Sequence, residues 1–226
     1  MTTATTPDET LPSGVVTFLF TDIENSSGWW EEHPIEMRTL LAAHDALIAE
    51  VVAEHDGAVV KHLGDGCWAA FGSATKAAAA AIDFERRHQV AAAEAEQHLD
   101  VRIGLHTGEV APTGRDYFGP VVNRAARVVD LANGNQIVCS SSCAALLAGF
   151  TLRSEGLHEL RGIGADEIYM LLSDAIATDQ QPLRRPVAPS SLPRPKTSLI
   201  GRASDIERGL GFALAEDSLV TLIGPG

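Results

Sequence analysis

Segments with the apolar pattern of β-strands alternate along this chain with segments that have the apolar spacing of helices. This alternation predicts a sheet protein with helices between its strands. Runs suited to strands cover residues 15–21, 59–71, 101–110 and 136–140, and three short ones follow at 150–153, 157–160 and 167–172. Between the runs, apolar residues recur at spacings of three and four, as on one face of a helix. The resulting order predicts an α+β fold, a ferredoxin-like βαββαβ core with a mainly antiparallel sheet and extra C-terminal strands.

Local signals indicate where the helices begin and end. Ser26 and Ser27 are residue types that favour a helix N-cap, and the free N–H groups of such a helix start can bind a substrate phosphate. The helical pattern continues to residue 52, with Pro34 expected to break or kink its first turns. A later helix is expected to start at Pro120 and to end near Asn133-Gly134.

Gly64-Asp65-Gly66 divides the run at 59–71 into two strands, as is typical of a tight hairpin. Asp22 directly follows the run at 15–21. A strand that ends in a carboxylate, beside a hairpin tip that carries another, can bind hard cations through oxygen ligands. On the alternative interpretation Asp65 serves only the turn, and Lys61 is a solvated strand residue.

A second polar pattern lies in the helix expected from Pro120. Asn123 and Arg127 are four residues apart, so they share one helix face. A polar face of this kind is also typical of a helix surface that only meets solvent, so the pattern alone leaves both interpretations open. His44 and His106 lie within apolar patterns, for which we expect structural roles.

The charge balance restricts the partners. A formal net charge of −13 over 226 residues opposes nonspecific binding to nucleic acid or to an anionic membrane. An acidic protein that binds a polyphosphate needs cations between the two. The three cysteines lack metal-ligand spacing and suggest a reducing compartment. The sequence shows no signal peptide and no apolar run of membrane-spanning length, so we expect a cytoplasmic protein.

Composition also divides the chain. Residues 1–13 are rich in Thr, Pro, Asp and Glu and are expected to form a disordered leader before a domain at 14–173. A Pro-rich linker is expected at 174–197. In the last segment, 198–226, a strand pattern runs into Gly224-Pro225-Gly226, which is similar to the start of a P-loop without its Lys-Ser/Thr end.

Several motifs together resemble the class III adenylyl/guanylyl cyclase catalytic domain over roughly residues 14–173. They are Phe20-Thr21-Asp22-Ile23, Lys61-His62-Leu63-Gly64-Asp65, Ile103-Gly104-Leu105-His106-Thr107-Gly108, and Asp116 with Asn123 and Arg127. Each motif is weak alone, but all agree in order and spacing. The chain is most similar to bacterial cyclases in which this domain precedes a STAND-type ATPase, here cut short. Trp68 is larger than the family pattern leads us to expect, which raises a question about packing behind the hairpin.

The resemblance implies a role for each matching residue. Asp22 and Asp65 match the two metal-binding aspartates, and the Ile23 carbonyl is expected as a further ligand, for two Mg²⁺ or Mn²⁺ ions per site. Lys61 and Asp116 match the pair that reads adenine.

The same resemblance assigns the remaining polar residues. Asn123 matches the residue that positions the ribose, and Arg127 the one that stabilises charge on the phosphate. In this family one site takes residues from two subunits, and this chain carries both sets. The resemblance therefore implies a homodimer with two shared sites that converts ATP to 3′,5′-cyclic AMP and pyrophosphate, with no nucleic-acid or membrane partner.

Three other interpretations compete with this one. A nucleotide-binding regulatory domain with little turnover is favoured by loss of a metal aspartate or of the arginine, and neither is lost. A non-enzymatic dimerisation module gives no reason for six site residues in register. Diguanylate cyclase or polymerase-palm chemistry would require a Gly-Gly-Asp/Glu-Glu/Asp-Phe type of turn, which the sequence lacks.

Overall fold

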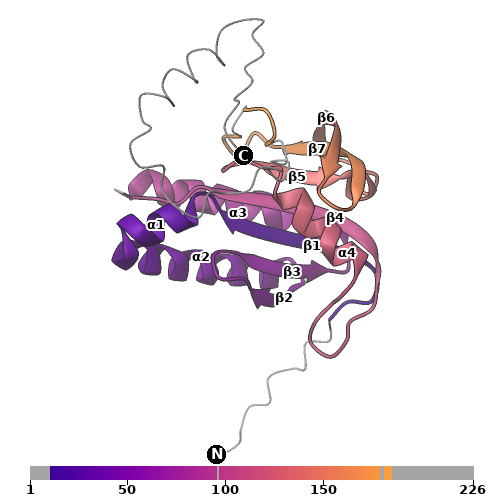
Figure 1. Ribbon diagram of the computed structural model, residues 1–226, viewed down its shortest axis with the longest axis horizontal. Coiled ribbons are helices and arrows are strands. Elements are labelled where there is room, and N and C mark those ends of the chain that lie inside the picture. Colours follow the sequence, from indigo (N-terminus) through magenta and orange to yellow (C-terminus); the bar gives the residue numbers. More distant parts are fainter. Residues whose placement is uncertain (1–10, 96, 179–180, 185–226) are drawn as a thin grey trace, which may run out of the picture. The chain divides into compact units, whose positions relative to one another are not determined.

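The computed structural model describes residues 11–95, 97–178 and 181–184, which fold around one seven-stranded sheet in the order β2-β3-β1-β4-β5-β7-β6 (Figure 1). The elements are β1 (Gly14–Ile23), α1 (Ser26–Glu32), α2 (Pro34–Glu54), β2 (Gly57–His62), β3 (Cys67–Phe71), α3 (Ala74–Glu94), β4 (Val101–Val110), α4 (Pro120–Val129), β5 (Ile137–Ser140), α5 (Ser141–Ala144), β6 (Thr151–Leu160) and β7 (Gly164–Leu172). Neighbouring strands of this sheet are antiparallel, except that β4 and β5 are parallel. The predicted α+β class, with a mainly antiparallel sheet and extra C-terminal strands, is confirmed.

The central strand β1 is buried on both of its faces. Phe18 and Phe20 belong to the core cluster that includes Ala125 of α4, whereas Leu19 and Ile23 belong to the cluster formed with α2 and α3. Alternate residues of a strand point to opposite faces, so a strand between two helical layers needs apolar residues at nearly every position. This double burial fixes the C-terminal end of β1, where Asp22 lies.

Two glycines of β4 let α4 lie directly on the sheet. A Cβ added to Gly104 would lie 2.6 Å from the backbone nitrogen of Val129, and one added to Gly108 would lie 2.6 Å from a methyl group of Val121. Only a residue without a side chain permits approaches this close. The glycines of the Ile103–Gly108 motif therefore set the height of α4 above the sheet.

One helix boundary agrees with the sequence expectations and one differs. The helical pattern is broken at Pro34 as expected, because His33 leaves the helical conformation and Pro34 becomes the first residue of α2, where its missing N–H is tolerated. The helix from Pro120 ends at Val129 rather than near Asn133. Beyond Val129 the chain forms tighter turns, whose N–H groups bond carbonyls three residues earlier.

The expected strands at 150–153 and 157–160 are one continuous strand, β6, so the three short C-terminal strands are two. β6 pairs with β7 along its length. The pairing shifts register between Ser154 and Gly156, and Gly156 has a φ of 84°. A bulge at this point absorbs the interruption in the apolar pattern, and pairing continues beyond it.

The described body extends beyond residue 173, after which we expected the linker to begin. Ile176 and Leu183 are buried, and the N–H of Arg184 donates to a carbonyl of the turn after α4 at 2.8 Å. Near the other end, the Tyr117 hydroxyl donates to the Pro12 carbonyl at 2.6 Å. The remainder of the expected leader and linker, and the P-loop-like segment at 198–226, lie outside the described residues.

The described residues also bear on the membrane and cysteine expectations. No helix among them combines the length and the apolar character needed to cross a membrane. Cys67, Cys139 and Cys143 are buried free thiols, so none of the three forms a disulfide.

Glu85 is a fully buried carboxyl on α3. Gln89 donates a hydrogen bond of 2.7 Å to its Oε1, while Oε2 lacks a partner among the described residues. Burial raises the pKa of Glu85 to about 7, and the hydrogen bond from Gln89 acts in the opposite direction. The folded protein therefore holds this proton through a pH range in which the unfolded chain releases it.

Replacing Glu85 by glutamine is expected to stabilise the protein above pH 7 and to change little at pH 4.5. The unfolded carboxyl ionises near 4.5 and the folded one near 7, so the free energy of unfolding falls as pH rises between these values and stays low above them. Removing the group should recover on the order of 2 kcal/mol at pH 8. Urea unfolding at both pH values measures this, with Glu94→Gln on the exposed end of α3 as the control. An equal effect at the two pH values would contradict the buried-proton explanation.

Candidate active site

The end of β1 and the tip of the β2–β3 hairpin bring two carboxylates to one place. The Ile23 N–H donates to the Asp65 carbonyl at 3.2 Å. A Cβ on Gly66 would lie 2.1 Å from the Thr21 carbonyl oxygen, so only glycine allows the hairpin tip to lie on the strand end. Asp22 and Asp65, the two expected metal-binding residues, flank this contact.

Asp22 also contacts Arg102, its direct cross-strand neighbour in β4. The Arg102 Nε donates to Asp22 Oδ2 at 2.5 Å, and the Arg102 Nη2 pairs with the same oxygen. Burial nevertheless raises the pKa of Asp22 above its ordinary value, Arg102 opposes this, and the negative charges of Asp65 and Asp130 add to it. A cation bound here would hold Asp22 ionised and relieve its repulsion with Asp65.

The donor atoms suit a hard divalent cation. Carboxylate oxygens are the ligands that Mg²⁺ and Mn²⁺ prefer. The Nε and Nη2 atoms of Arg102 both pair with Oδ2 of Asp22, and Oδ1 of Asp22 has no partner among the described residues. No cluster of three or more His, Cys, Asp or Glu side chains suited to a metal occurs in the described parts of the chain. Two carboxylates and the Ile23 carbonyl would therefore need oxygens from substrate or water, as is expected of metals that bind together with a polyphosphate.

Ser26 does not cap α1, contrary to the expectation. Asn25, at a φ of 54°, is the residue before the helix, and its side chain makes no capping hydrogen bond. Ser26 is already the first residue of α1, and its hydroxyl donates to Asp65 Oδ2, a charged acceptor that forms stronger hydrogen bonds than a neutral one. Ser26 thus orients a candidate metal ligand. Ser27 is exposed beside it, and a phosphate contact for either serine stays a prediction.

Lys61 and Asp116 are brought together from β2 and from the loop after β4. The Lys61 ammonium donates to Asp116 Oδ2 at 2.5 Å, and this hydrogen bond holds the pKa of Asp116 below its ordinary value. Lys61 also lies over the ring of Trp68, 4.7 Å from the ring centroid. Trp68 is buried and stacks on Phe20, with ring centroids 5.3 Å apart. The large Trp68 is therefore well packed, and it supports the pair from below.

α4 carries the other two candidates. Gly119, at a φ of 108°, precedes the helix, and Pro120 is its first residue, as predicted. Asn123 is exposed. The Arg127 Nη1 donates to Asp130 Oδ2 at 2.9 Å, and the Arg127 side chain is 36% exposed. Within the described chain Arg127 pairs with Asp130, and no ion pair joins its guanidinium to Asp22 or Asp65.

The candidate residues thus form separate groups within one chain. Asp22, Asp65 and Ser26 belong to the strand-end group, whereas Lys61 and Asp116 form a pair supported by Trp68. Across the described ranges, no hydrogen bond or ion pair joins the strand-end group to the Lys61–Asp116 pair.

Two functional contacts escaped the sequence analysis. Arg102 lies opposite Asp22 in the β1–β4 pairing, and Trp68 lies opposite both Phe20 and Lys61 in its two strand pairings. Cross-strand neighbours have adjacent Cβ atoms, so the register alone produces these contacts. If strand pairing had been assumed from the hairpin and the β4 motif, the register would have placed these residues opposite one another, and the contacts could have been predicted.

The two histidines that we expected to be structural are buried and hydrogen-bonded. His44 Nε2 lies 3.1 Å from Thr21 Oγ1, and His106 Nδ1 lies 2.7 Å from Ser140 Oγ. Burial lowers the pKa of His106 to about 4, so the ring is neutral at pH 7. Neither contact involves a predicted substrate-binding residue.

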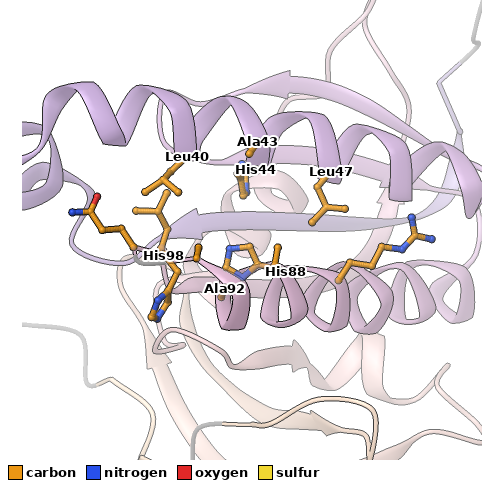
Figure 2. A pocket seen from close by; sticks show the side chains of 12 residues that line it. Leu40, Ala43, His44, Leu47, His88, Ala92 and His98 are labelled. Atoms are coloured by element: carbon orange, nitrogen blue, oxygen red, sulfur yellow. The ribbon is translucent and has the colours of Figure 1, made fainter.

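A separate cavity of about 400 Å³ lies between α2 and α3 (Figure 2). Its wall is mostly apolar, and side chains of both helices face one another across it: Leu40, His44, Leu47, His88 and Ala92. Among the described residues that line it, none is a candidate for substrate or metal binding. We therefore do not place the substrate there.

Comparisons with known proteins identify the family and the fold. The family profile described as the adenylate and guanylate cyclase catalytic domain matches residues 9–173. An uncharacterized protein of Mycobacterium bovis is 36% identical over 205 residues, which cover 86% of this chain and 70% of that protein. An adenylate cyclase of Schizosaccharomyces pombe is 33% identical over 163 residues, which cover 60% of this chain but only 10% of that enzyme.

Solved structures are similar in fold. An adenylate cyclase structure from Trypanosoma brucei, described in its monomeric state, has a TM-score of 0.67 at 24% identity and covers 77% of this chain and 96% of its own. The adenylyl cyclase CyaB from P. aeruginosa has a TM-score of 0.61 at 24% identity and covers 71% of this chain and 94% of its own. At this identity the similarity establishes the architecture, and the residues must supply the chemistry.

Proposed function

Because this chain belongs to the adenylate and guanylate cyclase catalytic domain family, we propose that it is an adenylate cyclase that converts ATP to 3′,5′-cyclic AMP and pyrophosphate. The observation that favours ATP is the Lys61–Asp116 pair, with its 2.5 Å hydrogen bond above the ring of Trp68. Relatives named adenylate cyclase agree with this choice.

The chemistry of the pair complements adenine. The Watson–Crick edge of adenine offers an acceptor at N1 and a donor at the 6-amino group. An ammonium can donate to N1, and a carboxylate can accept from the amino group. Guanine reverses both positions, so it would leave Lys61 facing a donor and Asp116 facing an acceptor. Polar groups that a bound base covers and leaves unpaired discriminate strongly between substrates.

The reaction joins the ribose 3′-oxygen to the α-phosphorus and breaks the bond from that phosphorus to the oxygen of pyrophosphate. Asn123 is proposed to orient the ribose so that the 3′-oxygen lies in line with the departing oxygen. Arg127 is proposed to stabilise the negative charge that develops on the phosphate. Asp22, Asp65 and the Ile23 carbonyl would hold two Mg²⁺ or Mn²⁺ ions, which would activate the 3′-hydroxyl and neutralise the phosphates.

We propose that the complete site forms between two copies of the chain. The strand-end group and the Lys61–Asp116 pair are not joined by any polar contact in the described residues, and Arg127 is held by Asp130. A two-fold dimer in which each chain provides metal ligands to one site and base, ribose and phosphate contacts to the other would contain two complete sites. An isolated monomer is then expected to be inactive.

The test is incubation of the full chain with ATP or GTP and either Mg²⁺ or Mn²⁺, with products separated by chromatography. Formation of cyclic AMP from ATP, at a kcat/KM at least ~100-fold above that for GTP, is expected from the hydrogen-bond complementarity. Preferred formation of cyclic GMP would overturn the assignment of ATP. Nucleotide binding without product would instead favour the regulatory-domain interpretation.

Exchanging the base-reading residues is expected to weaken the preference for ATP. In the double variant Lys61→Glu with Asp116→Cys, an acceptor replaces the ammonium and the carboxylate is lost, so kcat/KM for ATP should fall about 100-fold and the ratio for GTP over ATP should rise. Lys76→Glu on α3, which breaks an exposed ion pair with Asp56, is the control. An unchanged ATP preference in the double variant would show that Lys61 and Asp116 do not read the base.

A further inference from the structure

The helix α4 is joined to the far part of the sheet by a polar contact that the proposed chemistry does not use. The Arg124 Nη1 donates to Asp166 Oδ2 at 3.1 Å, and the Ser141 hydroxyl donates to Asp166 Oδ1 at 2.6 Å. The Asp166 side chain, in β7, is only 10% exposed. Both of its oxygens are therefore occupied, one by α4 and one by α5.

A neighbouring hydrogen bond joins α5 to β4, the strand beneath α4. Ser142, the next residue of α5, donates to the Thr107 carbonyl of β4 at 2.7 Å. Arg124, Asp166 and Ser141, which we call the α4 brace, thus connect three elements around one carboxylate that is 10% exposed.

The α4 brace adds a directional contact to the apolar packing of Ala125, Val128 and Val129, at a helix whose supporting surface is smooth at two points. Gly104 and Gly108 let the helix approach β4 closely, yet a glycine offers no side chain to interlock with a helix. At Gly104 and Gly108 the close packing fixes the distance between α4 and β4, but it opposes rotation of α4 about its own axis only weakly. A charged hydrogen bond has a defined direction, so Arg124 can oppose the rotation that the glycines do not.

Rotation of α4 would move both candidate residues that it carries. At about 100° per residue, Arg124 lies roughly 60° around the helix from Arg127 and about 100° from Asn123. We infer that the α4 brace is a positioning device, which fixes the rotation of α4 and thereby aims Asn123 at the ribose and Arg127 at the phosphate. This inference rests on the proposed function for its effect on turnover, but the brace itself can be tested without turnover.

The first test is kinetic. Arg124→Met and Asp166→Asn should each lower kcat about 10-fold while KM for ATP stays within about twofold, because misaimed groups affect the transition state more than ground-state binding. The kcat of the double variant should be no lower than that of the less active single variant, because both changes break the same connection. Arg124→Lys, which can still donate to Asp166, should stay within about threefold of the unchanged protein. Arg86→Met, which breaks an exposed ion pair with Asp83, is the matched control.

The second test is hydrogen exchange at the amides of α4 in the full chain without nucleotide. Loss of Arg124 or Asp166 should speed exchange across residues 121–129 about 10-fold, and Ser141→Ala should do so by a smaller factor, while Arg86→Met should not. Exchange that is unchanged in all three brace variants would overturn the inference, whether or not the protein makes a cyclic nucleotide. Faster exchange with a normal kcat would mean that the contact only stabilises α4, and this result would also overturn the positioning role. If the protein without substitutions is inactive and amide exchange is still faster in the variants, the proposed function is contradicted and the brace is still supported.

Discussion

Replacing Asp22 by asparagine is expected to lower turnover by on the order of a thousandfold while the protein stays folded. The change removes the charge of a proposed metal ligand, and loss of one group that stabilises transition-state charge acts on this scale. Asn keeps the size of the side chain, and Asp22 is only partly buried at the end of β1. Asp65→Asn should have a similar effect, because the two carboxylates are proposed to act on the same ions.

The control and a second readout make this result specific. Asp56→Asn alters an exposed aspartate that pairs with Lys76, and it should leave turnover unchanged. Binding of Mn²⁺ measured by electron paramagnetic resonance should weaken in Asp22→Asn and in Asp65→Asn, and not in Asp56→Asn. Near-normal turnover with either active-site variant would remove the two-metal assignment.

Mixing two inactive variants is expected to restore about a quarter of the normal activity. Asp22→Asn and Arg127→Ala should each be nearly inactive as homodimers, because both of their sites carry the defect. If metal ligands and Arg127 reach one site from different chains, a mixed dimer has one site with both changes and one with neither. Random pairing makes about half of the dimers mixed, each with one intact site of two.

The control for this mixture is a pair of variants whose changes fall in the same group. Asp22→Asn mixed with Asp65→Asn should regain nothing, because each site of the mixed dimer then lacks one metal ligand. Subunit exchange is checked independently with differently tagged chains. Absence of recovery between Asp22→Asn and Arg127→Ala, with exchange demonstrated, would show that both residues act within one chain.

The amino-acid sequence alone was sufficient for the order of the elements and for the hairpin. Gly64-Asp65-Gly66 between two apolar runs has a local reason to turn, and β1 is apolar over most of its length because it is covered on both faces. Pro120 after Gly119 marked the start of α4 for an equally local reason. Features of this kind depend on a few neighbouring residues, so they can be read without knowing the fold.

Boundaries were less predictable where two local signals competed. Asn133-Gly134 resembles a helix end, yet α4 stops at Val129 and the chain continues in tighter turns to that point. In the strand β6 the interruption near Gly156 was expected to separate two strands, but pairing with β7 carries the strand through a bulge. For β6 the hydrogen bonds of the neighbouring strand decided the outcome, and after α4 the hydrogen bonds of the tighter local turns did.

The contacts that define the candidate site were decided by the tertiary structure. Arg102 meets Asp22, and Trp68 meets Lys61, because strand register places them opposite one another across the sheet. Ser26 bonds Asp65 instead of capping its own helix because the hairpin tip brings a carboxylate within reach. The sequence by itself determined which residue types carry the chemistry and in what order, since those follow from local pattern. Except for Trp68, which meets Lys61 within one hairpin, their partners lie tens of residues away along the chain, and only the packing of the elements brings them into contact.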